Sequence, residues 1–432
     1  MRQRSQAACL FWYSSRLPFM NRSGFHLGVL LVSALALAIY ARRLDVSPPR
    51  HPDEVDLSRQ AVALAQTGRD ADGQRLPLYF RLHDNVWTPP VPVYMTAVVL
   101  KVRASASAIR IPSILLAALD VALIALVAAR LFQRPAPAIA AAVLLALTPS
   151  HFINGRVATA SIYPIAFELV WLLGLFVYVE RRQRWLLAGS TLSLGIGFYS
   201  HPVAVLMMPV YLGLTLAMLR RVDRSAATAL VALAGFAVPL AVMLPWFMRH
   251  HDLFRVTLGD WGLHTLANPR DGLRTRVFNW TIAARRISLF WDFFSPSYLF
   301  LTGGAGLVSS TQRTGLFLGV LAVPLCAGLY ELVVRRWNDA RWRLVCLGFI
   351  LAPLGAAMFE EPRAAGRALA MLPFGILIAA AGFDYLLTAP KRALQYAAIA
   401  AIVLIPFQFY RFYQDYFGGY PVRAAAAIAR SE

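Results

Sequence analysis

Long apolar runs, separated by short polar stretches, recur along the whole chain. Most runs have about 17 to 25 residues, the length with which a helix crosses a bilayer. The pattern predicts eleven membrane-spanning helices, at residues 24–41, 111–132, 135–149, 157–179, 185–200, 201–219, 226–247, 314–334, 341–358, 367–387 and 392–409. The expected fold class is an all-α polytopic membrane protein, a bundle of about 11 transmembrane helices.

One further apolar stretch, residues 89–100, is shorter than a span. As a helix it would reach only about 18 Å, against a hydrocarbon core of about 30 Å. Counting it as a span would also move every later connection to the opposite side of the membrane. We therefore expect this stretch to lie at the interface or to re-enter the membrane.

The composition agrees with a membrane protein, because 58% of the 432 residues are hydrophobic and only 15% are charged. A net charge of +20 is also typical of nucleic-acid-binding proteins, but the arginines form short clusters and not one basic face. Arg or Lys occurs in each of the connections 133–137, 180–185, 220–224, 335–343 and 390–392. The positive-inside rule therefore predicts that these connections face the cytoplasm, and no nucleic acid partner is expected.

The resulting topology divides the chain into three parts. Residues 1–23 form a cytoplasmic N-terminal segment, residues 24–409 one transmembrane domain, and residues 410–432 a short tail on the outer side. Two long connections, at about 42–110 and 248–313, are predicted to lie on the outer side as well.

The N-terminal segment and the cysteines add little to this picture. The segment lacks the apolar core and the cleavage site of a signal peptide, and Met20 is an alternative start. The three cysteines, Cys9, Cys326 and Cys346, show no metal-ligand spacing. We expect no disulfide on the outer face.

Acidic residues are concentrated in the first outer connection, where seven of the 22 lie between residues 42 and 88. The stretch RHPDEVDLSRQAVALAQTG predicts a helix that begins at Pro52 and ends near Gly68, with Asp53 and Glu54 in its first turn. In a purely structural interpretation, these acids complement the helix dipole. The alternative is that one of them faces a pocket between the spans, where apolar walls would raise its pKa and suit it to general base catalysis.

The same connection contains two other candidate sites. Asp70 and Asp72 suggest a calcium loop, but Arg81 stands at the twelfth position, where Glu is expected, so a polar turn is favoured. His83 and Trp87 are candidates for a sugar site, because sugars bind an aromatic face with polar groups at its edge. Anchoring of Trp87 at the membrane interface is the alternative.

Several motifs, taken in order, resemble those of a known superfamily. They are HPDE (51–54), WTPPVPVYMTAVVLKV (87–102), LALTPSHFINGRVA (145–158), GIGFYSHPVAVLMMPVYL (195–212), PRAAGRALAMLP (362–373) and YQDYFGGYP (413–421). They are similar to motifs of the GT-C glycosyltransferases, above all the bacterial members of family 39, the protein mannosyltransferase and aminoarabinose transferase-like group. The resemblance implies a GT-C-type bundle in a bacterial plasma membrane, with interfacial helices in its two long outer loops.

The resemblance also implies an enzyme that transfers a sugar from a polyprenyl-phosphate-linked donor to an acceptor hydroxyl on the outer side, with inversion. Its partners would be this membrane lipid and a glycan, lipid or protein acceptor; the sequence specifies neither the sugar nor the oligomeric state. In this family an acid of the first outer loop is the catalytic base, which assigns that role to Asp53, with Glu54 beside it. Aminoarabinose-branch relatives carry Glu-Lys where this chain has Trp87 and Thr88, and many members have an acid where it has Ser161.

Transfer from a polyprenyl phosphate also requires cationic groups for the leaving phosphate. Arg156, Arg363 and Arg367 are candidates, because guanidinium groups bind phosphate in a bidentate manner. The alternative for each is snorkelling to lipid headgroups. His201 is a candidate for contact with phosphate or a metal, or it begins an interfacial helix. Tyr298 belongs to a segment that in relatives closes over the site.

Two other functions compete with this hypothesis. Asp120 and Glu168 lie inside predicted spans, where an unpaired charge costs about 3 kcal/mol or more, so we expect them to be neutral or paired within the bundle. A proton relay through them would suit a transporter or lipid flippase, although the chain lacks the two similar halves typical of transporters. The other alternative is a non-catalytic GT-C relative. No metal site stands out, and a divalent metal cofactor would use His51 and Asp53.

Overall fold

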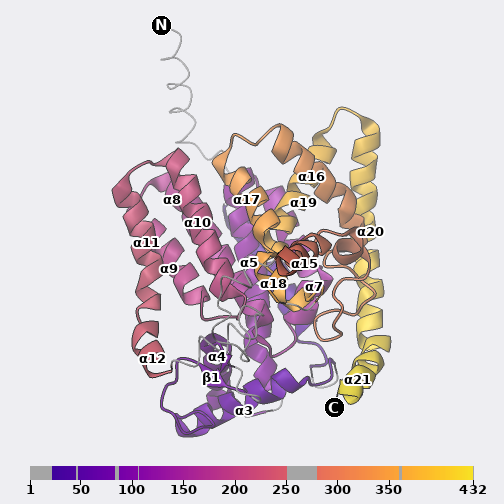
Figure 1. Ribbon diagram of the computed structural model, residues 1–432. Coiled ribbons are helices and arrows are strands. Elements are labelled where there is room, and N and C mark those ends of the chain that lie inside the picture. The colour runs from indigo at the N-terminus through magenta and orange to yellow at the C-terminus, as the bar shows by residue number, and fades with distance from the viewer. Residues whose placement is uncertain are drawn as a thin grey trace.

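The computed structural model describes residues 22–44, 47–82, 87–105, 107–250, 280–359 and 362–431. Within these ranges the protein is a bundle of helices with one two-stranded antiparallel sheet, formed by β1 (Phe80–Arg81) and β2 (Trp87–Thr88) (Figure 1). In its register, Phe80 lies opposite Thr88 and Arg81 opposite Trp87.

The bundle consists of helices that run side by side. They are α2 (Arg22–Tyr40), α5 (Ile111–Phe132), α6 (Pro135–Ala146), α8 (Tyr163–Arg181), α9 (Arg184–Gly197), α10 (Ala204–Val222), α11 (Ala226–Leu240), α16 (Ala322–Val334), α17 (Ala340–Leu351), α19 (Met371–Thr388) and α20 (Arg392–Phe417). The remaining elements are α3 (Pro52–Thr67), α4 (Pro90–Val102), η2 (Ala108–Arg110), α7 (Pro149–Asn154), η3 (Ala160–Ile162), α12 (Met243–Arg249), α15 (Trp280–Asp292), η4 (Ser297–Leu301), η5 (Gly319–Leu321), α18 (Leu354–Ala357), η6 (Ala365–Arg367) and α21 (Gly419–Ser431).

Each of the eleven predicted spans corresponds to a helix, but not every helix is as long as predicted. Seven of the described helices are long and apolar enough to cross a membrane, and α11 with α12 would be an eighth, bent by 43°. α6 has only 12 residues and α9 only 14. Both end shortly before a proline, Pro149 or Pro202, which lacks the N–H needed to continue the helical hydrogen bonds. The short segments that follow are therefore folded into the end of the bundle.

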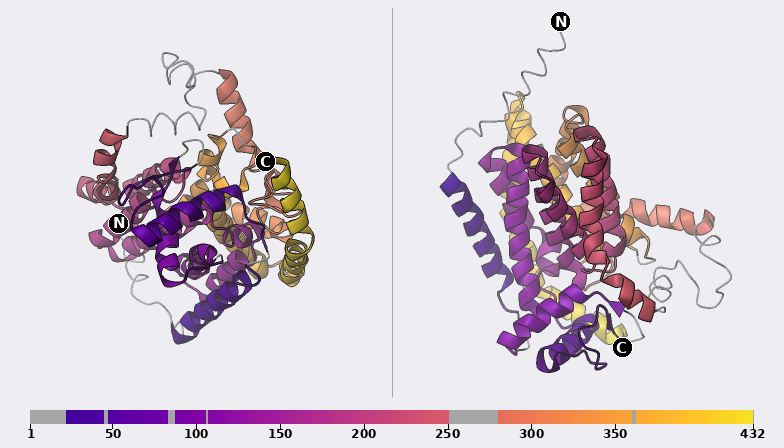
Figure 2. Two further views of the ribbon diagram at one scale, coloured as in Figure 1. Left: turned by 90° about the horizontal axis from the view of Figure 1, so that it is seen from below. Right: turned by 90° about the vertical axis from the view of Figure 1, so that its left-hand side faces the viewer.

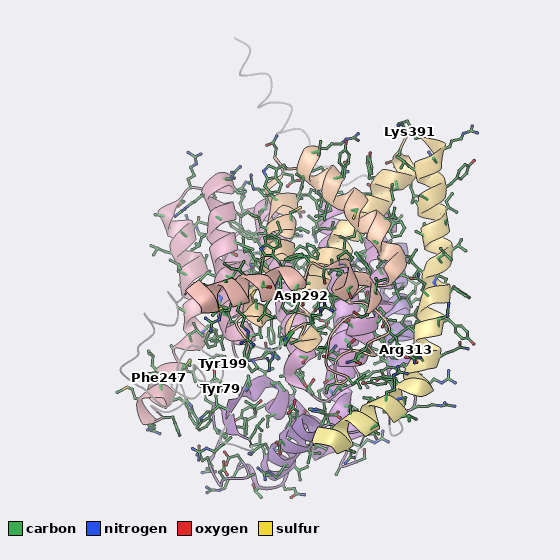
Figure 3. All side chains as sticks on the ribbon, turned by 45° about the vertical axis from the view of Figure 1, so that its right-hand side comes forward. Tyr79, Tyr199, Phe247, Asp292, Arg313 and Lys391 are labelled. Atoms are coloured by element: carbon green, nitrogen blue, oxygen red, sulfur yellow. The ribbon has the colours of Figure 1, made fainter. Side chains whose placement is uncertain are left out.

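The Arg-rich connections gather at one end of the bundle, as the predicted topology requires. Arg134, after α5, forms an ion pair with Asp384 near the end of α19. Arg341, at the start of α17, donates to the carbonyl oxygen of Arg130 at 3.1 Å. The turn between α19 and α20, which contains Lys391, lies at this end too (Figure 3).

Residues 47–82 and 87–105, from the first predicted outer connection, meet the C-terminal segment at the opposite end, whereas residues 251–279 of the second connection lie outside the described ranges. There α3 and α4 lie across the bundle and α21 follows the end of α20 (Figures 1 and 2). Ser47 donates to the carbonyl oxygen of Tyr416 at 3.3 Å, and the N–H of Val91 donates to that of Tyr199 at the same distance. α4 has 13 residues and is too short to count among the spans, which agrees with the prediction for residues 89–100.

The bundle interior contains polar groups that are paired with each other. Tyr211 donates to Glu168 at 2.8 Å, and His151 Nε2 lies 3.4 Å from the Asp120 carboxylate. The prediction that the two intramembrane acids are paired within the bundle is thus confirmed. Helices α16 and α19 pack closely: a Cβ on Gly382 of α19 would come within 1.7 Å of the carbonyl oxygen of Pro324, so only glycine allows α16 to approach here.

Candidate active site

Helix α3 positions the acidic residues of the first long connection, and its bounds were predicted correctly. Pro52 stands at its first position, and Gly68 ends it in the left-handed conformation, with φ 70°. His51 is the N-cap: its Nδ1 lies 3.3 Å from the backbone nitrogen of Asp53, and Glu54 accepts the His51 N–H in return. This capping box fixes the backbone of the first turn. As a result, the adjacent side chains of Asp53 and Glu54 point in different directions.

Glu54 points into the protein and is fully buried. Its carboxylate accepts two hydrogen bonds from Arg110, at 2.9 and 2.8 Å, and one from the N–H of Ala158 at 2.7 Å. The ion pair thereby joins α3 to the start of α5 and to the segment before η3. This burial corrects the prediction of a catalytic role for Glu54: the residue positions its neighbour and is not part of the cavity wall.

Asp53 points the other way, into a cavity of about 590 Å³ at this end of the bundle. The predicted residues that line the same cavity are His51, Asp53, Trp87, His201 and Arg367, and unpredicted ones include Asn154 and Ser309. Asp53 and Arg367 therefore line the same cavity. Gly366 lies against Ser161 on the cavity wall: a Cβ there would lie 2.9 Å from the Ser161 hydroxyl oxygen, so a larger residue would require this side chain to move.

The pKa of the Asp53 carboxyl is shifted in the direction opposite to the prediction. A hydrogen bond from the His51 ring and the charge of Arg367 hold the pKa of the Asp53 carboxyl below its usual value, although burial opposes them. His51 Nδ1 lies 3.4 Å from Asp53 Oδ2, and the carboxyl side chain is 69% exposed to the cavity. The predicted rise of this pKa was wrong, because the hydrogen bond with His51 and the charge of Arg367 outweigh the effect of burial. Asp53 is thus ionised at neutral pH.

His201 and Arg367 form a second polar pair on the cavity wall. His201 Nδ1 accepts the N–H of Val203 at 3.1 Å, so a neutral ring carries its proton on Nε2. Burial, assisted by the charge of Arg367, lowers the pKa of His201 to about 3, which keeps the ring neutral. The Arg367 guanidinium lies 4.2 Å from the centre of the Phe359 ring. The pair therefore offers a fixed positive charge and a neutral N–H donor.

Trp87 of β2 supplies an aromatic surface to the cavity. Its ring packs edge-on against Trp246 and His250, at centroid distances of 6.3 and 5.7 Å, and Arg81 lies over it at 5.1 Å. Among the described residues, none accepts a hydrogen bond from its buried Nε1. Because this nitrogen is buried, Trp87 presents its aromatic surface and not its N–H group to the cavity.

Three other predicted residues do not line the cavity. Arg363 forms an ion pair with Asp292, at 2.8 and 3.1 Å. Arg156 is fully buried, donates to the carbonyl oxygens of Tyr40 and Ser47, and is surrounded by aromatic rings. Both guanidinium groups are occupied within the protein, which corrects their assignment to a phosphate.

Tyr298 is also absent from the cavity wall. It is fully buried in η4 and packs against Phe293, so the predicted contact with a substrate is not supported. His83 lies outside the described residues. The loop of Asp70 and Asp72 is a polar turn, as favoured from the sequence: Asp70 accepts the N–H groups of Asp72 and Gln74 at 3.1 and 2.7 Å.

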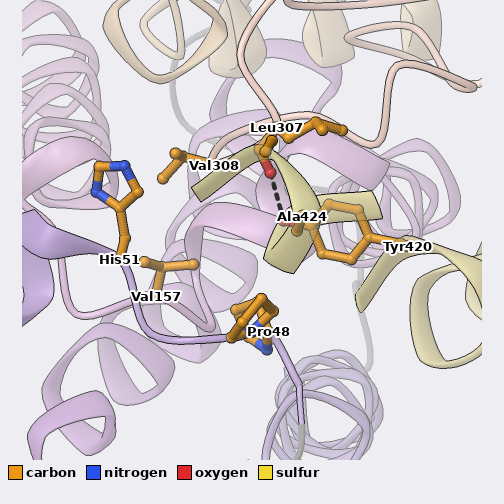
Figure 4. A pocket seen from close by; sticks show the side chains of 9 residues that line it. Pro48, His51, Val157, Leu307, Val308, Tyr420 and Ala424 are labelled. Atoms are coloured by element: carbon orange, nitrogen blue, oxygen red, sulfur yellow. Dashed lines mark hydrogen bonds between the residues drawn. The ribbon is translucent and has the colours of Figure 1, made fainter. Parts of the chain in front are cut away.

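A smaller cavity of about 170 Å³ adjoins the larger one (Figure 4). Its wall is mostly apolar and includes Pro48, Val157 and Ala424, and it shares His51 and Val308 with the larger cavity. Helix α21 closes one side, where Tyr420 donates to the carbonyl oxygen of Leu307 at 2.6 Å. The two cavities therefore meet beside the first turn of α3.

The candidate metal ligands His51 and Asp53 do lie together, but in the described ranges no third His, Cys, Asp or Glu joins them. Sequence reasoning missed Arg110, which holds Glu54, and Asn154, which donates to the carbonyl oxygen of Ser309 at 3.4 Å. Asn154 belongs to the HFINGRVA motif, one of the motifs that resemble the GT-C family, so its place in the site could have been predicted from the sequence. Arg110 could not, because nothing in the sequence joins it to a residue 56 positions away.

Comparison with known proteins reveals a shared fold. Residues 88–248 match the family model described as dolichyl-phosphate-mannose-protein mannosyltransferase. Among curated proteins, none matches the chain. The crystal structure of ArnT from Cupriavidus metallidurans bound to undecaprenyl phosphate superposes with a TM-score of 0.56 at 14% identity, covering 93% of this chain and 76% of ArnT.

The archaeal oligosaccharyltransferase AglB from Archaeoglobus fulgidus, in complex with an inhibitory peptide and a dolichol-phosphate, also has a TM-score of 0.56, at 12% identity. That alignment covers 90% of this chain and 56% of AglB. At such low identity the likeness establishes the fold and not the substrate. The chain therefore resembles this mannosyltransferase family over residues 88–248 and shares its overall fold with ArnT and AglB.

Proposed function

We propose that the protein is a membrane glycosyltransferase that moves a sugar from a polyprenyl-phosphate-linked donor to a hydroxyl group of an acceptor. The observation that carries this proposal is the meeting of Asp53, His201 and Arg367 in one cavity. An ionised carboxylate there faces a cation and a neutral N–H donor. Matches to structures with undecaprenyl phosphate and dolichol-phosphate bound support a lipid-linked donor.

In the proposed reaction, Asp53 accepts the proton of the acceptor hydroxyl while the hydroxyl oxygen attacks the anomeric carbon of the sugar. The bond between that carbon and the phosphate oxygen breaks, and the polyprenyl phosphate leaves with its electron pair. Arg367 and the Nε2–H of His201 would stabilise the phosphate as its charge develops. Attack from the face opposite the phosphate inverts the anomeric carbon.

The two cavities offer separate places for the substrates. The larger one, with Arg367 and His201, is the proposed donor site. The smaller, apolar one reaches His51 from the side of α21 and is the proposed approach for the acceptor. Because both adjoin the first turn of α3, the acceptor hydroxyl would arrive beside Asp53.

We further propose that this end of the bundle faces the outside of a bacterial plasma membrane. The opposite end carries the connections rich in Arg and Lys, among them residues 180–185, 220–224 and 335–343. By the positive-inside rule these lie in the cytoplasm, together with the N-terminus.

The function is tested by comparing membranes from cells with and without the protein. Mass spectrometry should show one polyprenyl-linked sugar accumulating when the protein is absent, because its consumer is missing. The purified protein should then transfer that sugar in a reconstituted assay. If the pool of lipid-linked sugars is unchanged and the protein moves a substrate across the membrane of proteoliposomes, the transporter hypothesis would replace the enzyme hypothesis.

Replacing Arg367 with glutamine should lower kcat/KM for the donor by about 10- to 100-fold, because a charge-assisted hydrogen bond contributes roughly 1.5–3 kcal/mol. Arg363→Gln is the matched control: it removes an equal charge from the same segment but breaks only a partly exposed ion pair with Asp292. Steady-state transfer kinetics with varied donor distinguish the two. Equal losses in both variants would contradict the phosphate role of Arg367.

The pH dependence of transfer should report the environment of Asp53. The lowered pKa keeps the carboxylate ionised as the pH falls, so the acid limb of the kcat/KM profile should lie below the usual carboxyl range. His51→Asn keeps a good N-cap residue but removes the ring that hydrogen-bonds Asp53. The acid limb of this variant should move to higher pH. An unchanged limb would mean that another group titrates.

A further inference from the structure

A third cavity, of about 460 Å³, lies between the chain before α16 and the end of α20. Its wall includes Phe300, Arg313, Gln408, Arg411, Phe412 and Asp415, and it shares no residue with the proposed active site. Figure 3 shows Arg313 near one end of α20 and Lys391 at the other, so this cavity belongs to the same end as α3 and α21. The proposed glycosyltransferase reaction makes no use of it.

The polar groups of this cavity favour an anion. Asp415, its single carboxylate among the described wall residues, is neutralised by Arg313 at 3.1 Å and by Arg423 at 2.6 Å. Arg411 makes no hydrogen bond or ion pair with any residue that the structure describes. Gln408 accepts the N–H of Val320 with its carbonyl oxygen at 3.0 Å, which leaves its NH₂ group as a donor. The cavity therefore presents an excess of positive charge and of donors.

The apolar groups indicate that the anion belongs to a lipid. Gln408, Arg411 and Asp415 lie on one face of α20, within seven residues, or about 10 Å of helix. Toward the middle of the bundle the exposed residues of α20 become apolar, as at Val403 and Phe407, which are 65% and 57% exposed. A ligand that fits both parts has a charged head at the membrane border and an acyl chain directed inward.

We propose that this cavity binds the phosphate of an anionic membrane phospholipid, with the headgroup at Arg313 and Arg411 and an acyl chain along α20. A guanidinium group near the membrane border attracts anionic headgroups, and two act together here. The exposed apolar residues of α20 beyond the cavity, Val403 and Phe407, distinguish such a lipid from a soluble anion, which would gain nothing from them. The inference holds whether or not the protein transfers a sugar, because the two cavities have separate walls.

The test measures lipid binding to the purified full-length protein by native mass spectrometry, in mixed micelles with phosphatidylglycerol or phosphatidylcholine. The wild type should retain phosphatidylglycerol selectively. Arg411→Gln, which breaks no contact with a described residue, should weaken this binding roughly fivefold, and Arg313→Gln with Arg411→Gln about 25-fold. Unchanged melting temperatures in phosphatidylcholine confirm that the variants are folded.

The matched control removes two charges elsewhere at the same end, by Arg59→Gln with Arg103→Gln, both exposed and outside the cavity wall. It should bind phosphatidylglycerol like the wild type. An equal loss in the control would show that net charge alone attracts the lipid, and retained binding in the cavity variants would place the lipid elsewhere. Displacement of the lipid by millimolar inorganic phosphate would make this a soluble-anion site; each of these results overturns the proposal.

Discussion

Asp53→Asn should reduce the rate of sugar transfer by a factor of about 10² to 10⁴, the range typical for loss of a general base. An asparagine amide has nearly the same shape, but it cannot accept the proton of the acceptor hydroxyl. The side chain is 69% exposed to the cavity, so the substitution leaves packing intact. Initial rates of transfer from the donor identified in membranes measure the effect. The variant should accumulate in membranes to the level of the wild type.

The control for this variant is Asp72→Asn, which removes an exposed carboxylate from the same connection without touching the cavity. Its transfer rate should match the wild type. Donor binding, measured by the donor concentration for half-maximal rate, should change little in Asp53→Asn because Arg367 and His201 remain. Undiminished transfer by Asp53→Asn would remove this residue from the mechanism.

Arg110→Ala should destabilise the fold by about 3–5 kcal/mol, the cost of breaking a buried ion pair by removing one partner. Glu54 would be left as an uncompensated charge with no exposure to solvent. Arg110 also donates to the carbonyl oxygens of Leu44 and Pro48, at 2.9 and 3.0 Å, and these would lose their donor. Thermal unfolding of the detergent-solubilised protein should show a large drop in melting temperature, or the variant should fail to accumulate.

Two comparisons make this prediction specific. Arg103→Ala, at an exposed position a few residues earlier, should change stability by no more than about 0.5 kcal/mol. Arg110→Lys keeps the charge but loses the bidentate geometry, and should fall between Arg110→Ala and the wild type. A melting temperature for Arg110→Ala equal to that of Arg103→Ala would contradict the role of the pair.

Local signals allowed much of this site to be predicted. Pro52 and Gly68 mark the ends of α3, because the ring of one and the left-handed backbone of the other are local requirements. The alternation of apolar runs with Arg clusters placed residues 53 and 367 at the same end of the bundle before their contact was known. Helix ends depend on residues close together in the sequence, and topology depends on how apolar and charged runs partition in the membrane. Both can therefore be predicted from the sequence alone.

Pairing between distant residues could not be predicted. Arg156, Arg363 and Arg367 look alike in the sequence, yet Arg363 has Asp292 as a partner and Arg156 has backbone carbonyl oxygens. Only three-dimensional packing decides which guanidinium faces the cavity. The pKa of Asp53 was mispredicted for a related reason, since the balance between burial, the hydrogen bond with His51 and the charge of Arg367 depends on the three-dimensional arrangement.

The early ends of α6 and α9 determine how deep the proposed reaction takes place. A helix of 12 residues covers about 18 Å, so α6 stops about 12 Å short of crossing a hydrocarbon core of 30 Å. The sugar would thus be transferred below the plane of the lipid headgroups, where weaker dielectric screening strengthens the attraction between a guanidinium and a phosphate. Bilayer thickness would then act on the reaction directly, by setting how far a water-soluble acceptor must descend to reach the donor.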